Sequence, residues 1–500
     1  MNTFSTALFH NFLGHSGNNF KFTIIAFLIL NPILLLMLGS FITGWIIIAE
    51  FIFCLAMALK CYPLQSGGLL ALEVILLQLT SPDALYEEVK GNFDVILLLM
   101  FMVAGIFFMQ QLLLLIFTKV LINLRNKALL CIVFCSLSAV MSAFLDALTV
   151  TAVLISVCLG FYSVYHRVAS GKDFNDIYHN HSSDEELKDE NKRCLEQFRY
   201  FLQNLLMHGV IGTALGGVCT MVGEPQNLVV AHEAGWSFFE FFRRMSVVTM
   251  PVLLTGLTLC FALEKFKWFS YGVQLPDTVF KVLQHYDKTH NQNITIEQKA
   301  KYVIQGIAII FLIAALALQW AEVGLIGLSV IVLLTAFNGT IEEHHIGEAF
   351  KEALPFTALL VVFFTIVSMI HEQALFEPLI SYVLNLPAES QPAFLFTING
   401  ILSMISDNVF VASVYISEVK AAYSAGDMTK EQFEHLAVAV NTGTNIPSVA
   451  TPNGQAAFLF LLTSAVAPLI RLSYLKMVWM ALPYTIVLSL VALLSIKYFV

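Results

Sequence analysis

Long apolar runs alternate with short polar segments along almost the whole chain. A run of about 20 apolar residues is long enough to cross a bilayer, and in lipid a helix satisfies all of its backbone groups within one segment. The pattern therefore predicts an all-α polytopic membrane protein. The expected helices cover 22–38, 42–60, 67–80, 94–118, 128–143, 147–165, 200–232, 246–263, 302–319, 322–337, 354–371, 391–405, 408–424, 433–470 and 475–498.

Two of these stretches are not simple crossings. The segment 128–165 is short for two passes, so it is either two short helices or a re-entrant hairpin that returns to the side it left. The run 433–470 is interrupted at Gly443, Pro447, Pro452 and Gly454. Because residues before proline avoid helical dihedrals, we expect this run to form a broken helix.

The two halves of the chain repeat one arrangement. Asp146 stands in an apolar run and is followed by a break at Glu224-Pro225, while Asp407 stands in another and is followed by Thr451-Pro452. The two intervals differ by the length of the polar stretch 166–199. Each half thus predicts a re-entrant hairpin with an acid at its tip, then a broken helix. Two such repeats of inverted topology are typical of secondary transporters, whose ion site lies between them.

The positions of lysine and arginine orient the chain. These residues gather in the loops 166–199 and 264–301, while 81–93 and 372–390 carry acids and a single lysine. By the positive-inside rule, the basic loops are cytoplasmic, which places the N-terminus in the cytoplasm and the C-terminus outside. Arg243, Arg244 and Lys430 fall on the wrong side in this scheme. We also expect a short interfacial helix over 236–244, where aromatic residues accompany two arginines.

Composition agrees with this class. Hydrophobic residues make up 58% of the chain and charged residues 12%, and the mean hydropathy is +0.78. Soluble domains average about 45–50% apolar and about 25% charged residues. The net charge of -9 comes without a basic cluster, so we expect no nucleic acid partner. The cysteines show no CxxC or metal spacing, and we expect no cofactor and no enzymatic activity. The first apolar run is too long for a cleavable signal peptide.

Asp146 is the first candidate for an ion site, because a carboxylate at membrane depth is costly and usually functional. Na⁺ is a hard cation that binds oxygen ligands, and one carboxylate can hold either Na⁺ or a proton. Thr149, about one turn further on, could add an oxygen ligand. The alternative is that Asp146 only caps the helix that begins near Ala147, a role that does not exclude ion binding.

Asp407 is the second candidate and stands between Ser406 and Asn408. All three side chains supply oxygen atoms, and all three are also good helix caps. An ion site and a helix cap are therefore both open here, and capping is a stronger alternative than at Asp146.

The two broken helices add further oxygen donors. An unwound segment frees backbone carbonyls, and these could coordinate a cation together with side-chain oxygens. The alternative is a kinked helix whose polar side chains only satisfy the freed backbone. The candidate ion-binding residues here are Glu224, Asn227, Thr444, Asn445, Thr451 and Asn453.

Other polar residues within the apolar runs are weaker candidates. His208, near the start of the first broken helix, could sense pH, although a structural hydrogen bond is the commoner role of such a histidine. The acids Glu50, Glu73, Asp94 and Glu322 are expected to face the membrane interface.

Four segments together resemble the NhaB-type sodium/proton antiporters of Gram-negative bacteria: SAFLDALTVTAV at 142–153, GEPQNL at 223–228, ISDNVF at 405–410 and NTGTNIPSVATPNGQ at 441–455. The resemblance covers essentially the whole chain. It extends to the ion transporter superfamily, which includes sodium-coupled dicarboxylate carriers. It implies that the important membrane aspartate of the family falls on Asp146. The Ser-Asn-Thr hairpin tips of the superfamily are replaced here by carboxylate-bearing tips, which would favour cations over an anionic substrate.

The resemblance also implies a homodimer in the bacterial inner membrane, built from a scaffold and a mobile transport domain. The expected division has five parts: 1–127 as N-terminal scaffold helices, 128–232 as the first transport repeat, 233–390 as further scaffold, 391–470 as the second transport repeat and 471–500 as a C-terminal helix.

Together these features predict a secondary active antiporter that expels Na⁺, and also Li⁺, in exchange for H⁺. Two carboxylates in the cycle would let more protons than sodium ions move, which would make the exchange electrogenic. A sodium-coupled dicarboxylate symporter on the same scaffold is the alternative, but no lysine or arginine stands near either tip in the sequence. An intramembrane hydrolase with two aspartates is less favoured, because the chain carries no Gly-x-Gly-Asp or metal motif.

Overall fold

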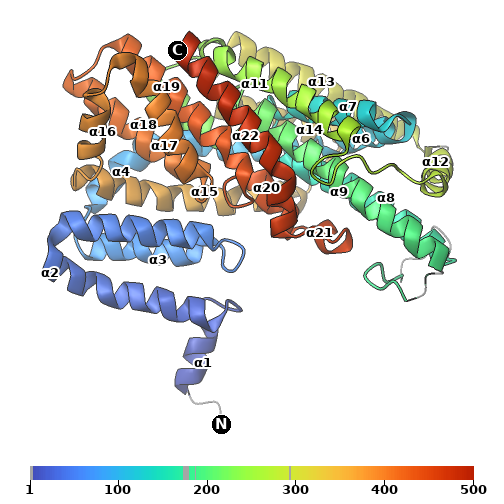
Figure 1. Ribbon diagram of the computed structural model, residues 1–500, viewed down its shortest axis with the longest axis horizontal. Helices are drawn as coiled ribbons and strands as arrows, with labels where there is room; N and C mark the ends of the chain where they lie inside the picture. Colours follow the sequence, from blue (N-terminus) through green and yellow to red (C-terminus); the bar gives the residue numbers. More distant parts are fainter. Residues whose placement is uncertain (1–3, 173–178, 186, 188, 292–293) are drawn as a thin grey trace.

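The fold is described from a computed structural model, which covers residues 4–500 except 173–178, 186, 188 and 292–293. Throughout these residues the regular structure is helical and contains no β-strand, as the apolar pattern predicts (Figure 1). The N-terminal part comprises α1 (Phe4–Asn11), α2 (Asn18–Ala56), α3 (Pro63–Leu76), α4 (Pro82–Gly91), α5 (Phe93–Phe107) and α6 (Gln110–Asn123).

The first predicted hairpin and broken helix are both present. The hairpin consists of α7 (Lys127–Ser142) and α8 (Ala147–Ala169), and the broken helix consists of α9 (Asp189–Gly217) and α10 (Pro225–Ala234). Proline suits the first position of α10, because the N–H that it lacks would have no partner within the helix. Helix α7 packs along α9. We call these four helices the first unit.

A second unit repeats this order of elements. Its hairpin consists of α17 (Gln391–Ser403) and α18 (Asn408–Ala425), and its broken helix consists of α19 (Lys430–Asn445), the 3-10 turn η2 (Pro447–Ala450) and α20 (Ala456–Thr463). Helix α17 packs along α19 just as α7 packs along α9. In Figure 1 the second unit occupies the left of the molecule and the first unit the right.

The remaining helices surround and connect the two units. Helix α13 begins with a capping box: the Oγ1 atom of Thr295 accepts from the N–H of Gln298 at 3.2 Å, and the Oε1 atom of Gln298 accepts from the N–H of Thr295 at 3.1 Å. These elements are α11 (Phe238–Phe266), α12 (Asp277–Asn291), α13 (Ile296–Leu318), α14 (Val323–Asn338), α15 (Glu343–Glu372), α16 (Glu377–Leu384), η1 (Ala388–Ser390), α21 (Val466–Leu469) and α22 (Tyr474–Phe499).

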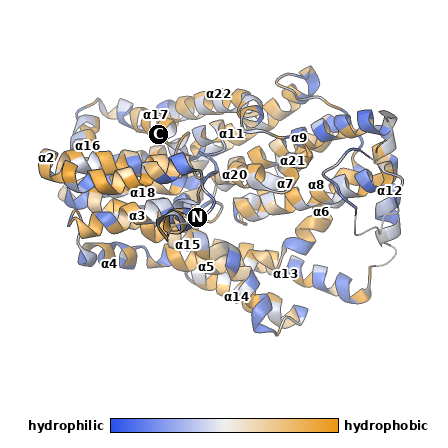
Figure 2. Cartoon of the chain, turned by 90° about the horizontal axis from the view of Figure 1, so that it is seen from below, coloured by the Kyte–Doolittle hydropathy of each residue, from blue (hydrophilic) through white to orange (hydrophobic). Residues whose placement is uncertain are grey.

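Six helices in the described part of the chain are long and apolar enough to cross a membrane. The pair α4 and α5, bent by 56° at a short break, would add a seventh. Apolar residues cover most of these helices, whereas hydrophilic residues gather on α12 and in the loops (Figure 2). The chain is therefore a multi-pass membrane protein. The six helices are α2, α8, α11, α13, the part 353–372 of α15, and α22.

One predicted division between helices is confirmed and one predicted helix is wrong. The spans expected at 22–38 and 42–60 are the two helical parts of α2, which meet at a kink at Gly39, where φ is 78° and ψ is 173°. A positive φ is open to glycine without steric cost, so the chain turns there without a longer loop. The stretch expected as one helix over 94–118 is divided between α5 and α6.

The interfacial helix expected over 236–244 is also wrong. Ser237 caps α11 by accepting from the N–H of Glu240 at 3.2 Å, and the helix then continues into the apolar run. Arg244 forms ion pairs with Glu240 at 2.9 Å and with Glu434 of α19 at 2.8 Å. Arg244 thus connects α11 to an acid of the second unit.

Candidate functional site

The two predicted tip acids occupy the same structural position. Asp146 is the N-cap of α8, and its Oδ2 atom accepts from the N–H groups of Leu148 at 3.0 Å and Thr149 at 3.3 Å. Asp407 is the N-cap of α18, and its Oδ1 atom accepts from Val409 at 2.8 Å and Phe410 at 3.2 Å. The capping role considered for both residues is therefore real.

Both tip acids line one cavity of about 480 Å³. Thr149 and Asn453 line it as well, so four of the predicted ion-binding residues meet there. The opposite wall comes from the ends of α2 and α3, from α5 and from α15. The cavity therefore lies between the two units on one side and the predicted scaffold helices on the other.

One basic residue also reaches this cavity. Lys351 of α15 is part of its lining, although it is far from both tips in the sequence. Its side chain is 74% exposed, and its Nζ atom lies 3.9 Å from a carboxylate oxygen of Glu348. No basic residue lies near the tips in the sequence, but in the structure α15 brings this lysine to the rim of the cavity.

Glu224 lies at the break of the first unit and is buried, with 4% of its surface exposed. Its backbone is extended, with φ -147° and ψ 145°, as expected before a proline. Its carboxylate accepts hydrogen bonds from the side-chain amides of Gln226 and, at 3.3 Å, Gln455. It also interacts electrostatically with Asp146 and Asp407. Glu224 is therefore within electrostatic range of both tip acids, where the units meet.

A chain of amide side chains joins the two breaks. Gln226 donates to the Oδ1 atom of Asn445 at 2.6 Å, and Asn445 donates to the Oδ1 atom of Asn227 at 3.0 Å. Asn227 in turn donates to the carbonyls of Gly217 and Thr220, both at 2.7 Å. Two carbonyls freed by the first break are thus satisfied by a side chain, which is the structural alternative considered for these residues.

The polar side chains of the second break are also mostly engaged within the protein. Thr444 donates to carbonyls of its own helix, Thr451 donates to Met404 at 2.5 Å, and Asn453 donates to Ala56 at 2.5 Å. Asn408 accepts from Ser403 and donates to Ser448 at 3.2 Å.

Two oxygens near the second tip have no hydrogen-bond partner among the described residues. They are the buried hydroxyl of Ser406 and the Oδ1 atom of Asn453. Because a buried oxygen without a partner is costly, these two atoms are the best placed of the predicted neutral ligands to bind an ion.

The contacts between hairpin and break match in the two units. A Cβ added to Gly223 would lie 2.7 Å from the carbonyl oxygen of Ser142, and one added to Gly454 would lie 2.4 Å from that of Ser403. Thr220 donates to the carbonyl of Ala143 as Thr451 donates to that of Met404. A side chain at either glycine would force the hairpin away from the break.

These contacts correct the alignment of the two breaks. The sequence comparison paired Pro225 with Pro452, but the contacts pair Thr220 with Thr451 and Glu224 with Gln455, a shift of about one helical turn. Alignment on the prolines was wrong because a proline marks only where the chain turns. The close-packed glycines and the threonines determine how each break is aligned with its hairpin. The length difference between the halves therefore no longer equals the stretch 166–199.

His208 lies away from the tip acids, in a buried polar cluster. Its Nε2 atom is 3.0 Å from Glu264 and its Nδ1 atom is 2.8 Å from the hydroxyl of Tyr484. Lys127 pairs with the same glutamate at 2.9 Å, and the Cys131 thiol is also close. These contacts supply the structural hydrogen bonds that were considered the commoner role, and pH sensing stays a prediction.

Two expected interface acids are instead buried together. The Nδ2 atom of Asn31 donates to Glu50 at 2.8 Å and to Glu73 at 2.9 Å. Both glutamates are 7% exposed, so their placement at the interface is wrong, whereas Asp94 and Glu322 are exposed as expected. Each of three neighbouring apolar runs contains one of these polar residues. Only the packing of α2 against α3 shows that the three side chains meet.

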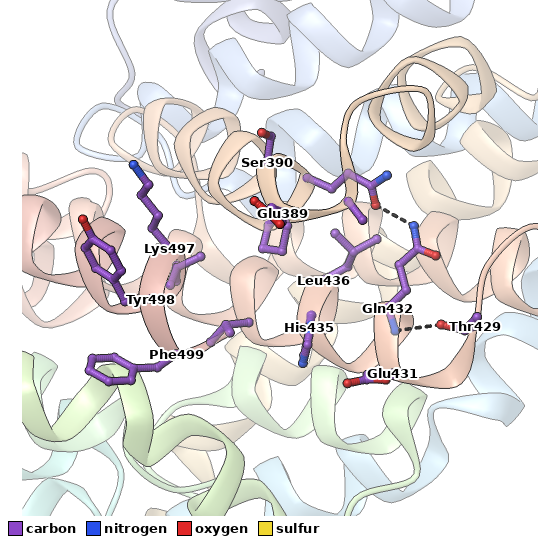
Figure 3. A pocket seen from close by; sticks show the side chains of 15 residues that line it. Glu389, Ser390, Thr429, Glu431, Gln432, His435, Leu436, Lys497, Tyr498 and Phe499 are labelled. Carbon is purple, nitrogen blue, oxygen red and sulfur yellow. Dashed lines mark hydrogen bonds between the residues drawn. The ribbon is translucent and has the colours of Figure 1, made fainter.

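A further cavity, of about 670 Å³, lies near the C-terminus (Figure 3). It is formed by η1, α17, α19 and the end of α22, and Gln432 donates across one side of it to Gln391 at 2.6 Å. Its lining residues include none of those predicted to bind an ion. The cavity between the tips is therefore the better candidate for the functional site.

Comparison with known proteins gives one consistent result. The model of the family described as "Bacterial Na+/H+ antiporter B (NhaB)" matches residues 1–500. The chain is 63% identical over 497 residues to the Na(+)/H(+) antiporter NhaB of a Marinomonas species, a match that covers 99% of both chains. It is 59% identical over 492 residues to that of Pseudomonas fluorescens, covering 98% of both, and 59% identical over 487 residues to that of Hahella chejuensis, covering 97% of both.

Proposed function

Because the chain belongs to the NhaB family of bacterial Na⁺/H⁺ antiporters, we propose that it exchanges Na⁺ for H⁺ at carboxylates held where its two hairpin tips meet. The observation that carries this proposal is the single cavity lined by both Asp146 and Asp407. Glu224 lies behind it, within electrostatic range of both. The hard cations Na⁺ and Li⁺ bind the same oxygen ligands, so the proposal includes Li⁺.

Competition at these carboxylates couples the two ions. A carboxylate at membrane depth is costly when charged and empty, so each is neutralised either by a proton or by a cation. Arrival of Na⁺ displaces protons, and arrival of protons displaces Na⁺. Since an empty charged site is disfavoured, neither ion crosses without exchange for the other. Several carboxylates serving one Na⁺ would release more than one proton, which makes the exchange electrogenic.

The cavity position supports alternating access by movement of the two units. In this scheme 128–232 and 391–470 form the transport domain, which moves against the scaffold of 1–127, 233–390 and 471–500. The cavity lies at the boundary between the two domains, with the tips on one side and α2, α3, α5 and α15 on the other. Movement of the transport domain along this boundary would expose the tips first to one side of the membrane and then to the other.

The inner membrane and a cytoplasmic N-terminus are part of the same proposal. They follow from the basic residues of the loops 166–199 and 264–301. Cysteines introduced at positions 168 and 265 of a cysteine-free variant should label only from the cytoplasm, and one at position 385 only from outside. Labelling of 168 and 385 from the same side would contradict the inverted topology. A homodimer is expected from the family resemblance.

A sodium-coupled dicarboxylate symporter is the second candidate, and the observation in its favour is Lys351 at the cavity rim. A dicarboxylate would need more positive charge than this one exposed lysine offers, because Asp146 and Asp407 line the same cavity. The cavity therefore favours a cation.

The test uses everted membrane vesicles in which respiration has acidified the interior and quenched a pH-sensitive dye. Addition of Na⁺ or Li⁺ should dequench the dye in vesicles that carry the protein and leave vesicles without it unchanged. Succinate should have no effect on either. A response that requires both Na⁺ and succinate would replace the antiporter with the symporter, and a lack of response to Na⁺ would contradict both.

A further inference from the structure

Three histidines converge outside the candidate ion site, at the end of α8. His166 lies in the last turn of this helix, and His179 and His181 lie in the segment that follows. The Nδ1 atom of His166 is 2.7 Å from the Nε2 atom of His179. One nitrogen from each of the three rings lies within 4.8 Å of the other two.

The positions of the rings suit a metal ion better than a chance contact. The centroids of His166 and His179 are 4.9 Å apart, and those of His179 and His181 are also 4.9 Å apart. Zn²⁺ binds imidazole nitrogens at about 2.0–2.1 Å in tetrahedral geometry, which separates the nitrogens by about 3.3 Å. The three nitrogens lie between 2.7 Å and 4.8 Å from one another, so the rings would have to shift to reach that spacing. The Nε2 atom of His166 and the Nδ1 atom of His181 are buried and form no hydrogen bond among the described residues.

A carboxylate stands behind this cluster. An oxygen of Asp184 lies 3.5 Å from the Nε2 atom of His166, on the side of the ring away from His179. Histidine ligands of metals usually present their other nitrogen to a carboxylate, which fixes the tautomer and the ring orientation. Asp184 is itself held by Arg199 at 2.8 Å and Arg471 at 3.2 Å.

An ion could reach the cluster from solvent. A cavity of about 610 Å³ lies over it, and its lining includes His179, His181 and Asp184. His166 forms the buried end of the cluster, with 0% of its surface exposed. The cluster therefore has one fully buried ligand, while the other two border the cavity.

We propose that His166, His179 and His181 form a binding site for a divalent transition metal ion of the Zn²⁺ type. Imidazole ligands select such ions over Na⁺, which prefers oxygen. Because His166 belongs to α8 and the other two ligands to the following segment, a bound ion fastens this segment onto the end of the helix. The link continues through Asp184 to Arg199 of α9 and to Arg471 at the start of the C-terminal segment.

The experiment measures Zn²⁺ binding to the purified full-length protein by calorimetry, and the absorption spectrum of bound Co²⁺ as a report of geometry. Wild type should bind one ion in tetrahedral geometry. His181→Ala should abolish this binding, and Asp184→Asn should weaken it by about 10–100-fold, the usual effect of losing a carboxylate behind a histidine ligand. Trypsin cleavage within 166–199 should slow with Zn²⁺ in wild type and stay unchanged in His181→Ala.

The chain provides a matched control. Glu342, His344 and His345 form a second cluster whose ligand atoms lie equally close, but all three are exposed. The double variant His344→Ala/His345→Ala should bind the ion like wild type. Na⁺-driven proton movement, in which we assign no role to any of these histidines, shows that each variant is folded.

Two results would overturn the proposal. One is a wild-type protein that binds no Zn²⁺ at micromolar concentrations, in which case the histidines only anchor the segment. The other is binding that survives His181→Ala or disappears in the control variant, which would place the ion at the exposed cluster.

Discussion

The two units hold their hairpins and breaks together with the same contacts, yet they differ in the residue at the centre of the break. Gly223 and Gly454 pack against matching carbonyls, and Thr220 and Thr451 bind matching carbonyls. At the next position the first unit has Glu224, and the second has Gln455. The shared contacts are the framework, and the acid is what distinguishes the first unit.

The difference is complementary, because the second unit uses its amide to bind the acid of the first. Gln455 donates to Glu224 at 3.3 Å, and Gln226 donates to the same carboxylate. The hairpin tips, in contrast, are alike, since each carries an aspartate that caps a helix. A symmetric pair of tip acids and one asymmetric central acid therefore make up the proposed ion site. The variants below test whether the three carboxylates differ as their positions suggest.

The largest effect is expected from Asp146→Asn, which should abolish Na⁺-driven proton movement in everted vesicles. Asparagine caps a helix about as well as aspartate, so the thermal midpoint of unfolding of the purified protein should stay near that of wild type. Loss of transport in a folded protein would then result from loss of the carboxylate charge at position 146. A wild-type apparent affinity for Na⁺ in this variant would remove Asp146 from the site.

Glu224→Gln makes the two breaks alike and should be the next most harmful change. The amide keeps one acceptor oxygen but can hold neither a proton nor the charge that attracts Na⁺. We expect the rate of Na⁺-driven proton movement to fall by at least about tenfold, which corresponds to about 1.4 kcal/mol.

The double variant Glu224→Gln/Gln455→Glu sharpens this test by returning a carboxylate to the other side of the same hydrogen bond. It should recover part of the activity lost in the single variant. An unchanged rate and an unchanged H⁺/Na⁺ ratio in Glu224→Gln would show that the asymmetry has no part in transport.

Gly223→Ala and Gly454→Ala test the framework that the two units share. The new Cβ would lie 2.4 Å from the carbonyl oxygen of Gly217 in one case and of Ser403 in the other. Such overpacking costs about 1–3 kcal/mol, so both variants should lower the unfolding midpoint in detergent to a similar extent.

Gly160→Ala is the matched control for the glycine variants, because its Cβ would meet nothing within 4 Å in the middle of α8. Alanine favours a helix by about 1 kcal/mol over glycine, so this change should raise the midpoint or leave it unchanged. A loss as large as in the other two variants would contradict the close-packing argument.

The smallest effect is expected from Asp407→Asn, which should change coupling more than rate. This variant keeps its cap and leaves Asp146 and Glu224 in place, so fewer protons should move for each Na⁺. Exchange measured in proteoliposomes should then depend less steeply on membrane potential. If its potential dependence and Na⁺ affinity both match wild type, Asp407 is only a helix cap.

The hairpins, the breaks and their acids could be predicted from the sequence because each depends on local chemistry. A long apolar run predicts a helix, an aspartate just before such a run predicts an N-cap, and a proline after a glutamate predicts a break in the helix. The register of the two breaks could not be predicted, because it depends on which glycine lies against which carbonyl across the hairpin.

Residues brought in from distant elements were also missed. Gln455 at Glu224, Lys351 at the cavity rim, and Asn31 between two glutamates all come from segments far along the chain. The predicted ligands Asn227 and Thr444 were singled out for their oxygens, but the Oδ1 atom of Asn227 accepts from Asn445 at 3.0 Å, and the hydroxyl of Thr444 is directed to carbonyls of its own helix. The sequence shows which residues have oxygen atoms that could bind an ion, and only the packing shows which of these oxygens are free to do so.

The central claim is that Na⁺ and protons compete for one set of carboxylates, and proton release on Na⁺ binding tests it most directly. Calorimetry of the purified protein in two buffers with different ionisation enthalpies measures this release. We predict about one or more protons released for each Na⁺ bound, with apparent Na⁺ affinity falling as pH falls, and no signal from Asp146→Asn. Na⁺ binding that releases no proton and has the same affinity at every pH would contradict the account.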